Sequence, residues 1–252
     1  MRLNKSMIRT WYSIGLLSLM FSTVAYSDEL KGDVSQITKA QALEQALLSK
    51  DLDVAATFVD EISATDHEQS VVLATMLYRL SAVMMSHSEE YEDRILAQLA
   101  KAEALLDKVT SEHTNPEHSG AAISSNQAPN ILAQANALMS GVIGLRIGIS
   151  PWKGIFLGSK SSSYLELAMK AAPNDHLVIW MSAIRYHRTP ASFGGDIEKA
   201  RTQYAKLAFA TDAESGGYGW LRKEALRSYC LLAKRGEVPE ACVLAENPQR
   251  VN

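Results

Sequence analysis

Helical periodicity recurs along most of the chain, and it limits the possible folds more than any other feature of the sequence. Apolar residues return at the three- and four-residue spacing that defines one face of an α-helix. The segments with this spacing are residues 40–49, 52–62, 71–85, 93–109, 130–146, 161–172, 177–186, 196–210, 221–233 and 239–246. The best strand candidate, residues 177–180, would have no second strand to pair with. The sequence therefore predicts an all-α protein.

Some of the predicted helices share a second pattern: a small residue, a large residue four positions later and an apolar residue three positions after that. The sets are Ala55, Val59 and Ile62; Ala102, Leu106 and Val109; Ser161, Leu165 and Ala168; and Ala200, Tyr204 and Leu207. Such a face suits close packing of antiparallel helices, although any amphipathic helix can supply one such set. The repetition favours stacked helical hairpins.

The residues before the predicted helix 196–210 suit a tight turn. Gly194 and Gly195 permit positive φ angles, and Asp196 can accept hydrogen bonds from the free N–H groups at the start of the helix. We expect Phe193 to pack between two hairpins. A valine at Gly195 should destabilise the turn if that residue has a positive φ.

The same turn carries a family resemblance. Pro190, Phe193, Gly194, Gly195 and Asp196 belong to a P-x-x-F-G-G-D-x-x-K-A segment. Preceded by a helix that stops at Pro173, this segment resembles the tetratricopeptide repeat, a helix-turn-helix unit of 34 residues. It is also similar to a turn in the periplasmic helical component that accompanies some tripartite solute transporters. The resemblance covers residues 161–210 and implies antiparallel helical hairpins stacked as a tetratricopeptide-repeat-like (TPR-like) array.

The N-terminal residues have the order of a secretory signal peptide. Arg2, Lys5 and Arg9 precede an apolar run over residues 11–24, and small residues at 25 and 27 precede Asp28. The run is short for a membrane anchor. We expect a signal peptide over residues 1–27, cleaved after Ser27. The rest, residues 28–252, would form one periplasmic helical domain that does not span the membrane and carries a polar loop at about 111–130.

Charge and cysteines narrow the possible partners. Loss of residues 1–27, which hold three basic residues and no acid, changes the formal net charge from −3 to −6. A mildly acidic chain with scattered lysines and arginines is a poor candidate for binding nucleic acid or an anionic membrane surface.

Cys230 and Cys242, the only cysteines, would share an oxidising compartment and lie at equal distance from Gly236, so we expect a disulfide. Two buried thiols are the alternative.

A search for chemistry gives no catalytic, metal or cofactor site. The glycine-rich segment 154–161 lacks the Gly-Lys step of a nucleotide-binding loop, and His113 and His118 match no metal-ligand spacing. Neither a Gly-x-Ser-x-Gly elbow nor a His-Glu-x-x-His motif occurs. The segment 150–160 carries much apolar surface for a loop, and we expect it to fold back onto the helices rather than to line a groove.

Two function classes remain open. The first is a non-enzymatic periplasmic scaffold whose helical surface binds an envelope protein or a small ligand, with Trp152, Phe156, Trp180 and Tyr186 as candidate partner-surface residues. The resemblance adds a variant of this role, a solute-binding helper associated with a transporter. The second class is an envelope hydrolase with acids on separate helices, which would need a cleft with clustered titratable groups.

Overall fold

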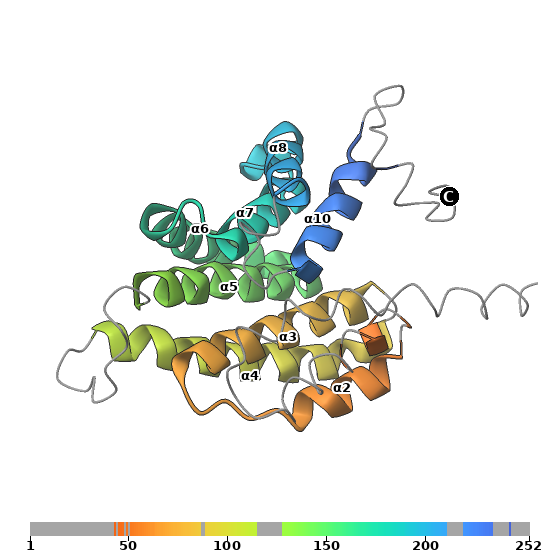
Figure 1. Ribbon diagram of the computed structural model, residues 1–252, viewed down its shortest axis with the longest axis vertical. Coiled ribbons are helices and arrows are strands. Elements are labelled where there is room, and N and C mark those ends of the chain that lie inside the picture. Colours follow the sequence, from red (N-terminus) through yellow and green to blue (C-terminus); the bar gives the residue numbers. More distant parts are fainter. Residues whose placement is uncertain are drawn as a thin grey trace, which may run out of the picture.

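A computed structural model describes residues 43, 45–47, 49, 51–86, 89–114, 128–210, 219–233 and 242. Every element in these ranges is helical, which confirms the predicted all-α class (Figure 1). The elements are α2 (Leu52–Asp60), α3 (His67–Met85), η2 (Glu89–Tyr91), α4 (Glu92–Thr114), α5 (Ala128–Ile149), η4 (Pro151–Lys153), α6 (Gly154–Ala171), α7 (His176–Arg188), η5 (Ala191–Phe193), α8 (Ile197–Ala208) and α10 (Gly219–Leu231). The predicted signal peptide lies outside the described residues.

Consecutive helices pack in pairs, and α5 connects the two halves of the molecule. The most extensive contacts join α3 to α4, α5 to α6 and α7 to α8. In Figure 1, α5 runs between a layer of α2, α3 and α4 and a layer of α6, α7 and α8. It contacts α3, α4, α6 and α7, while α10 closes the array against α8. Buried apolar side chains from α2 to α10 form one continuous cluster.

The repeated small-large-apolar sets lie on the buried faces of their helices. Ala55 and Val59 of α2, and all three residues of each set in α4, α6 and α8, are buried, while Ile62 is half-buried just after α2. The four sets therefore mark the faces that these helices turn toward the core.

The central helix α5 is apolar on most sides because other helices pack around it. Its residues Asn130–Ile149 are long and apolar enough to cross a membrane by length and composition alone. More than half of the window is buried inside the protein, where α5 meets helices on several sides. A helix that is apolar nearly all round is expected at such a position.

Aspartates begin several helices, as the sequence predicted for Asp196. Asp175 accepts a hydrogen bond from the Val178 amide at 3.0 Å, and Asp196 accepts one from the Lys199 amide at 3.0 Å. The backbone N–H of Lys199 is the main reason why the pKa of Asp196 lies below its ordinary value. Each carboxylate satisfies an amide that the first helical turn leaves without a backbone partner.

The turn before α8 is closed by its own backbone. Pro190 is the N-cap residue of η5. Its carbonyl accepts from the Gly195 amide at 3.1 Å, and the Tyr186 carbonyl accepts from the Asp196 amide at 3.0 Å. The positive φ, +91°, is at Gly194. These bonds draw the chain together, and Phe193 at this turn is 75% exposed. The expectation that Phe193 packs between hairpins was wrong.

Gly195 is required for a different reason from the one expected. A Cβ at this position would lie 1.7 Å from the Thr189 carbonyl oxygen. We expect Gly195→Ala to lower the free energy of unfolding by about 2 kcal/mol, because the backbone must move to relieve the contact. Gly194→Asn should cost less, since asparagine tolerates the left-handed region. Thermal melts of the two variants compare the costs, and a wild-type melt for Gly195→Ala would contradict this account of the turn.

Several predicted boundaries were wrong. The predicted helix 161–172 begins earlier, because α6 starts at Gly154. The predicted helix 130–146 also begins earlier, because α5 starts at Ala128. The predicted loop 111–130 overlaps helices at both ends, because α4 continues to Thr114 and α5 starts at Ala128. The residues between Thr114 and Ala128 lie outside the described residues. Residues 234–241, which include Gly236, and residues 243–252 also lie outside. Of the predicted helix 239–246, the structure therefore describes Cys242 alone.

Candidate functional site

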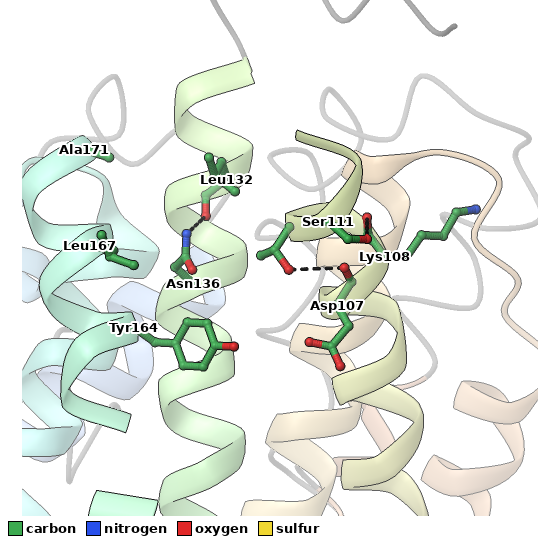
Figure 2. Close-up of a pocket in the computed structure, with 9 residues that line it drawn as sticks. Asp107, Lys108, Ser111, Leu132, Asn136, Tyr164, Leu167 and Ala171 are labelled. Carbon is green, nitrogen blue, oxygen red and sulfur yellow. Dashed lines mark hydrogen bonds between the residues drawn. The ribbon is translucent and has the colours of Figure 1, made fainter. Parts of the chain in front are cut away.

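A groove of about 700 Å³ lies between α4, α5 and α6 (Figure 2). The described residues that line it are Asp107, Lys108, Thr110, Ser111, Leu132, Asn136, Tyr164, Leu167 and Ala171. The three helices come from two consecutive pairs, so the groove depends on how these pairs meet.

Helical spacing places each set of lining residues on one face. Asp107 and Ser111 are four positions apart on α4, and Leu132 and Asn136 are four apart on α5. On α6, Tyr164, Leu167 and Ala171 follow at three and four positions. Residues with these spacings are neighbours on a helix surface. Figure 2 shows α4 on the opposite side of the groove from α5 and α6, with the Lys108 side chain extending away from them.

The polar groups in the groove are partly committed to their own helices. The Asn136 amide nitrogen donates to the Leu132 carbonyl at 2.9 Å, and the Ser111 hydroxyl donates to the Lys108 carbonyl at 3.2 Å. The Thr110 hydroxyl similarly lies 3.0 Å from the Leu106 carbonyl oxygen. The Asn136 and Thr110 side-chain oxygens retain lone pairs for a ligand that carries N–H groups. Figure 2 shows the Tyr164 hydroxyl directed toward α4.

Apolar surface completes the lining. Leu167 is 57% exposed although it is a large aliphatic residue, and Leu132 and the Tyr164 ring are half-buried beside it. Asp107 is the one carboxylate among the described lining residues, and within the described ranges no cluster of three His, Cys, Asp or Glu residues could hold a metal. Apolar walls with a few hydrogen-bonding groups are the usual composition of a binding site.

No family model, curated protein or solved structure matches the chain. The role of the groove is therefore derived from its own side chains.

The four candidate partner-surface residues lie in three different environments. Trp152 and Phe156 are 66% and 71% exposed, and Tyr186 is half-buried with the Lys199 ammonium 5.5 Å from its ring centre. Trp180 is only 3% exposed, so its assignment to a surface was wrong. It lies on α7 in a run of buried residues that occupies every side of the helix.

The segment 150–160 does not fold back onto the helices as expected. Pro151 begins η4, and Gly154 begins α6, so Ile155 and Phe156 occupy the first turn of a helix. Ile155 is 82% exposed, and of the apolar residues in this turn Leu157 is the one that packs against the core. The helix directs one side of its first turn inward and leaves the other side exposed.

None of the groove-lining residues was among the residues singled out from the sequence. A signal for α6 was nevertheless present. Leu165 and Ala168 mark its buried face, while Tyr164, Leu167 and Ala171 form a second apolar stripe at helical spacing. A second stripe on one helix indicates either another packing neighbour or a binding surface.

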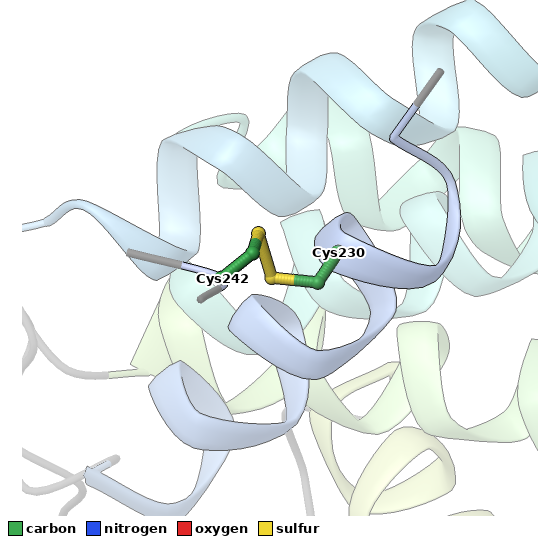
Figure 3. Close-up of a disulfide and its surroundings, with 2 residues drawn as sticks. All are labelled: Cys230 and Cys242. Carbon is green, nitrogen blue, oxygen red and sulfur yellow. A yellow bond between two sulfur atoms is a disulfide. The ribbon is translucent and has the colours of Figure 1, made fainter. Parts of the chain in front are cut away.

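The structure joins Cys230, on α10, to Cys242 through a disulfide with a Cα–Cα distance of 5.5 Å, the pairing that the sequence predicted (Figure 3). Cys242 is 1% exposed. The disulfide thus fixes the chain after α10 to the last described helix.

We expect the protein as isolated to contain no free thiol, which mass spectrometry after alkylation without reductant checks directly. Replacement of both Cys230 and Cys242 by alanine should lower the free energy of unfolding by about 3 kcal/mol, because closing this 12-residue separation restricts the unfolded chain. Urea titration gives that free energy. Two alkylated cysteines in unreduced protein would contradict the pairing.

Proposed function

We propose that this chain is a non-enzymatic scaffold of the bacterial cell envelope that binds an extended segment of a partner protein in the groove between α4, α5 and α6. Export with removal of residues 1–27 would place it in the periplasm. The observation that carries the proposal is the groove itself, where the exposed Leu167 and the half-buried Tyr164 face oxygen acceptors on the opposite helix.

The packing of the helices supports a repeat-type scaffold. The first helices of the successive pairs, α3, α5 and α7, contact one another in order, and each also contacts the helix that follows it. In helical repeat arrays, stacking of this kind forms extended surfaces used for binding. The TPR-like description of residues 161–210 is part of this proposal.

The lining fits a peptide better than a small polar solute. Leu132, Leu167 and the Tyr164 ring offer sites for apolar side chains, while Asp107 and Asn136 offer oxygen acceptors for peptide N–H groups. An extended segment can use both kinds of contact at once, since its side chains and its backbone point in different directions.

Site-specific photo-crosslinking in the source cells tests the proposal. A photoreactive phenylalanine analogue at Leu167 should give a discrete adduct with another protein, whereas the same analogue at Val54 should not. Val54 is a suitable control because it is an apolar residue, 41% exposed, on the distant helix α2.

A second arm tests whether the groove is responsible. With the crosslinker at Lys108, Leu167→Asp should abolish the adduct, because a charge on the apolar wall would be desolvated by the bound segment. Val54→Asp should leave the adduct unchanged. Equal adducts from Leu167 and Val54, or an adduct that persists in Leu167→Asp, would show that the groove is not the binding site.

A further inference from the structure

Three large apolar side chains protrude together at the start of α6. Trp152, Ile155 and Phe156 are 66%, 82% and 71% exposed, and we name them the Trp152 patch. Their spacing of three and four positions places them on one side of the η4–α6 junction. Single exposed apolar residues are ordinary, but a group of this size at one helix end indicates a surface that a membrane or another molecule covers.

The charge around the Trp152 patch differs in sign from that of the whole chain. The formal net charge is −3, yet residues 118–165 contain no Asp or Glu. Lys153 lies inside the patch, with its ammonium 5.8 Å from the centre of the Trp152 ring. The ammonium of Lys160, four residues after Phe156 on α6, lies 5.8 Å from the Tyr164 ring centre. Among the described residues of α6 and η4 up to Tyr164, the charged side chains beside the apolar group are therefore those of lysines.

We propose that the Trp152 patch docks the protein onto an anionic phospholipid bilayer. Tryptophan is favoured at the boundary between lipid headgroups and acyl chains, where its ring is buried and its N–H stays hydrated. Ile155 and Phe156 would enter the acyl region, and Lys153 and Lys160 would contact lipid phosphates. This is shallow docking of one helix end, and Trp152, Lys153, Ile155 and Phe156 are not among the described residues that line the groove between α4, α5 and α6.

The observations favour a lipid surface over a second protein. Lysine is depleted at protein–protein interfaces, whose polar rims carry charges of both signs. The Trp152 patch instead combines lysines with aromatic and aliphatic tips and no acid in the surrounding sequence. That combination is typical of segments that lie at the surface of an anionic membrane.

Vesicle binding by the protein purified from the envelope fraction tests the proposal. Sedimentation with vesicles of equal parts phosphatidylglycerol and phosphatidylcholine should carry down the wild type. The triple variant Trp152→Ser, Ile155→Ser, Phe156→Ser should partition at least about tenfold more weakly, because the apolar contact supplies much of the affinity. The control Phe193→Ser should partition like the wild type, since it removes a side chain that is 75% exposed at another turn.

The lysines give a second, separable readout. Replacement of both Lys153 and Lys160 by glutamine should weaken partitioning into the anionic vesicles about tenfold or more, at roughly fivefold for each lysine. It should leave partitioning into pure phosphatidylcholine unchanged. Circular dichroism melts that match the wild type would show that the variants are folded, as expected for exposed positions.

Tryptophan quenching locates the contact. Phosphatidylcholine brominated on its acyl chains, mixed with phosphatidylglycerol, should quench part of the tryptophan emission of the wild type. In the protein without residues 1–27, which carry Trp11, Trp152→Phe should remove that quenching, because Trp180 and Trp220 are only 3% and 7% exposed. Lack of vesicle binding, or equal binding by the wild type and the triple variant, would overturn the proposal and leave a protein partner as the occupant of the Trp152 patch.

Discussion

Trp180→Ala is expected to lower the free energy of unfolding by about 4 kcal/mol, the cost of deleting a large aromatic side chain from a core. Trp180 is 3% exposed. Its ring meets the Tyr78 ring edge to face at 5.8 Å and the Trp220 ring edge to face at 5.1 Å. These contacts tie α7 to α3 and α10, so the cavity would lie where three helices meet. Urea titration measures the loss as a lower midpoint at an unchanged slope.

Trp152→Ala is the matched control, because it removes the same side chain from a position that is 66% exposed. Its effect on the free energy of unfolding should stay within about 0.5 kcal/mol. Comparable losses in the two variants would show that Trp180 does not occupy the core. The pair also separates stability from membrane docking, since only Trp152→Ala should weaken vesicle binding.

Burial of Trp180 illustrates what periodicity can and cannot decide. Residues 177–183 of α7 are all buried, so this helix has no exposed face through that stretch. An unbroken apolar run over 177–181 is a local sign of such burial, and it would have assigned Trp180 to the core. The large aromatic side chain alone is compatible with a partner surface, whereas the apolar residues on both sides of Trp180 in sequence indicate the core.

Local signals predicted the local structure well. Asp175 and Asp196 cap α7 and α8, and the small-large-apolar sets identify the buried faces, because both depend on residues within one or two helical turns. The start of α6 was missed because Gly154 and Gly158 suggested a loop. Most of α6 before Ser161 is on the surface, where its glycines cost little packing, and Pro151 begins the preceding 3-10 turn.

The groove could not be predicted, because it depends on distances between helices rather than on patterns within one. Asp107 and Leu167 line the same space although they lie 60 positions apart in sequence. Each helix supplies an ordinary-looking polar or apolar face, and the concavity arises only where α4 stands apart from α5 and α6. Ion pairs between residues far apart in sequence could not be predicted either, because they also depend on distances between helices.

Arg79→Ala is expected to lower the free energy of unfolding by about 3 kcal/mol, through loss of both packing and a largely desolvated ion pair. Arg79 is 6% exposed on α3, and its guanidinium lies 2.8 Å from a Glu224 carboxylate oxygen. The guanidinium carbon is also 3.9 Å from the centre of the Trp220 ring. Both partners belong to α10, so Arg79 attaches this last described helix to the first half of the array.

A double-mutant cycle with Arg79→Ala and Glu224→Ala isolates the pair itself. We expect a coupling free energy of about 2 kcal/mol, less than for a fully buried pair because the Glu224 side chain is 42% exposed. The matched pair is Arg94 and Asp53, whose atoms are 2.6 Å apart but whose side chains are 39% and 80% exposed. Its coupling should be below about 1 kcal/mol and should fall further in high salt. If the two cycles gave equal couplings, burial against Trp220 would not strengthen the Arg79 pair, and the attachment of α10 would have to depend on its apolar contacts with α8 instead.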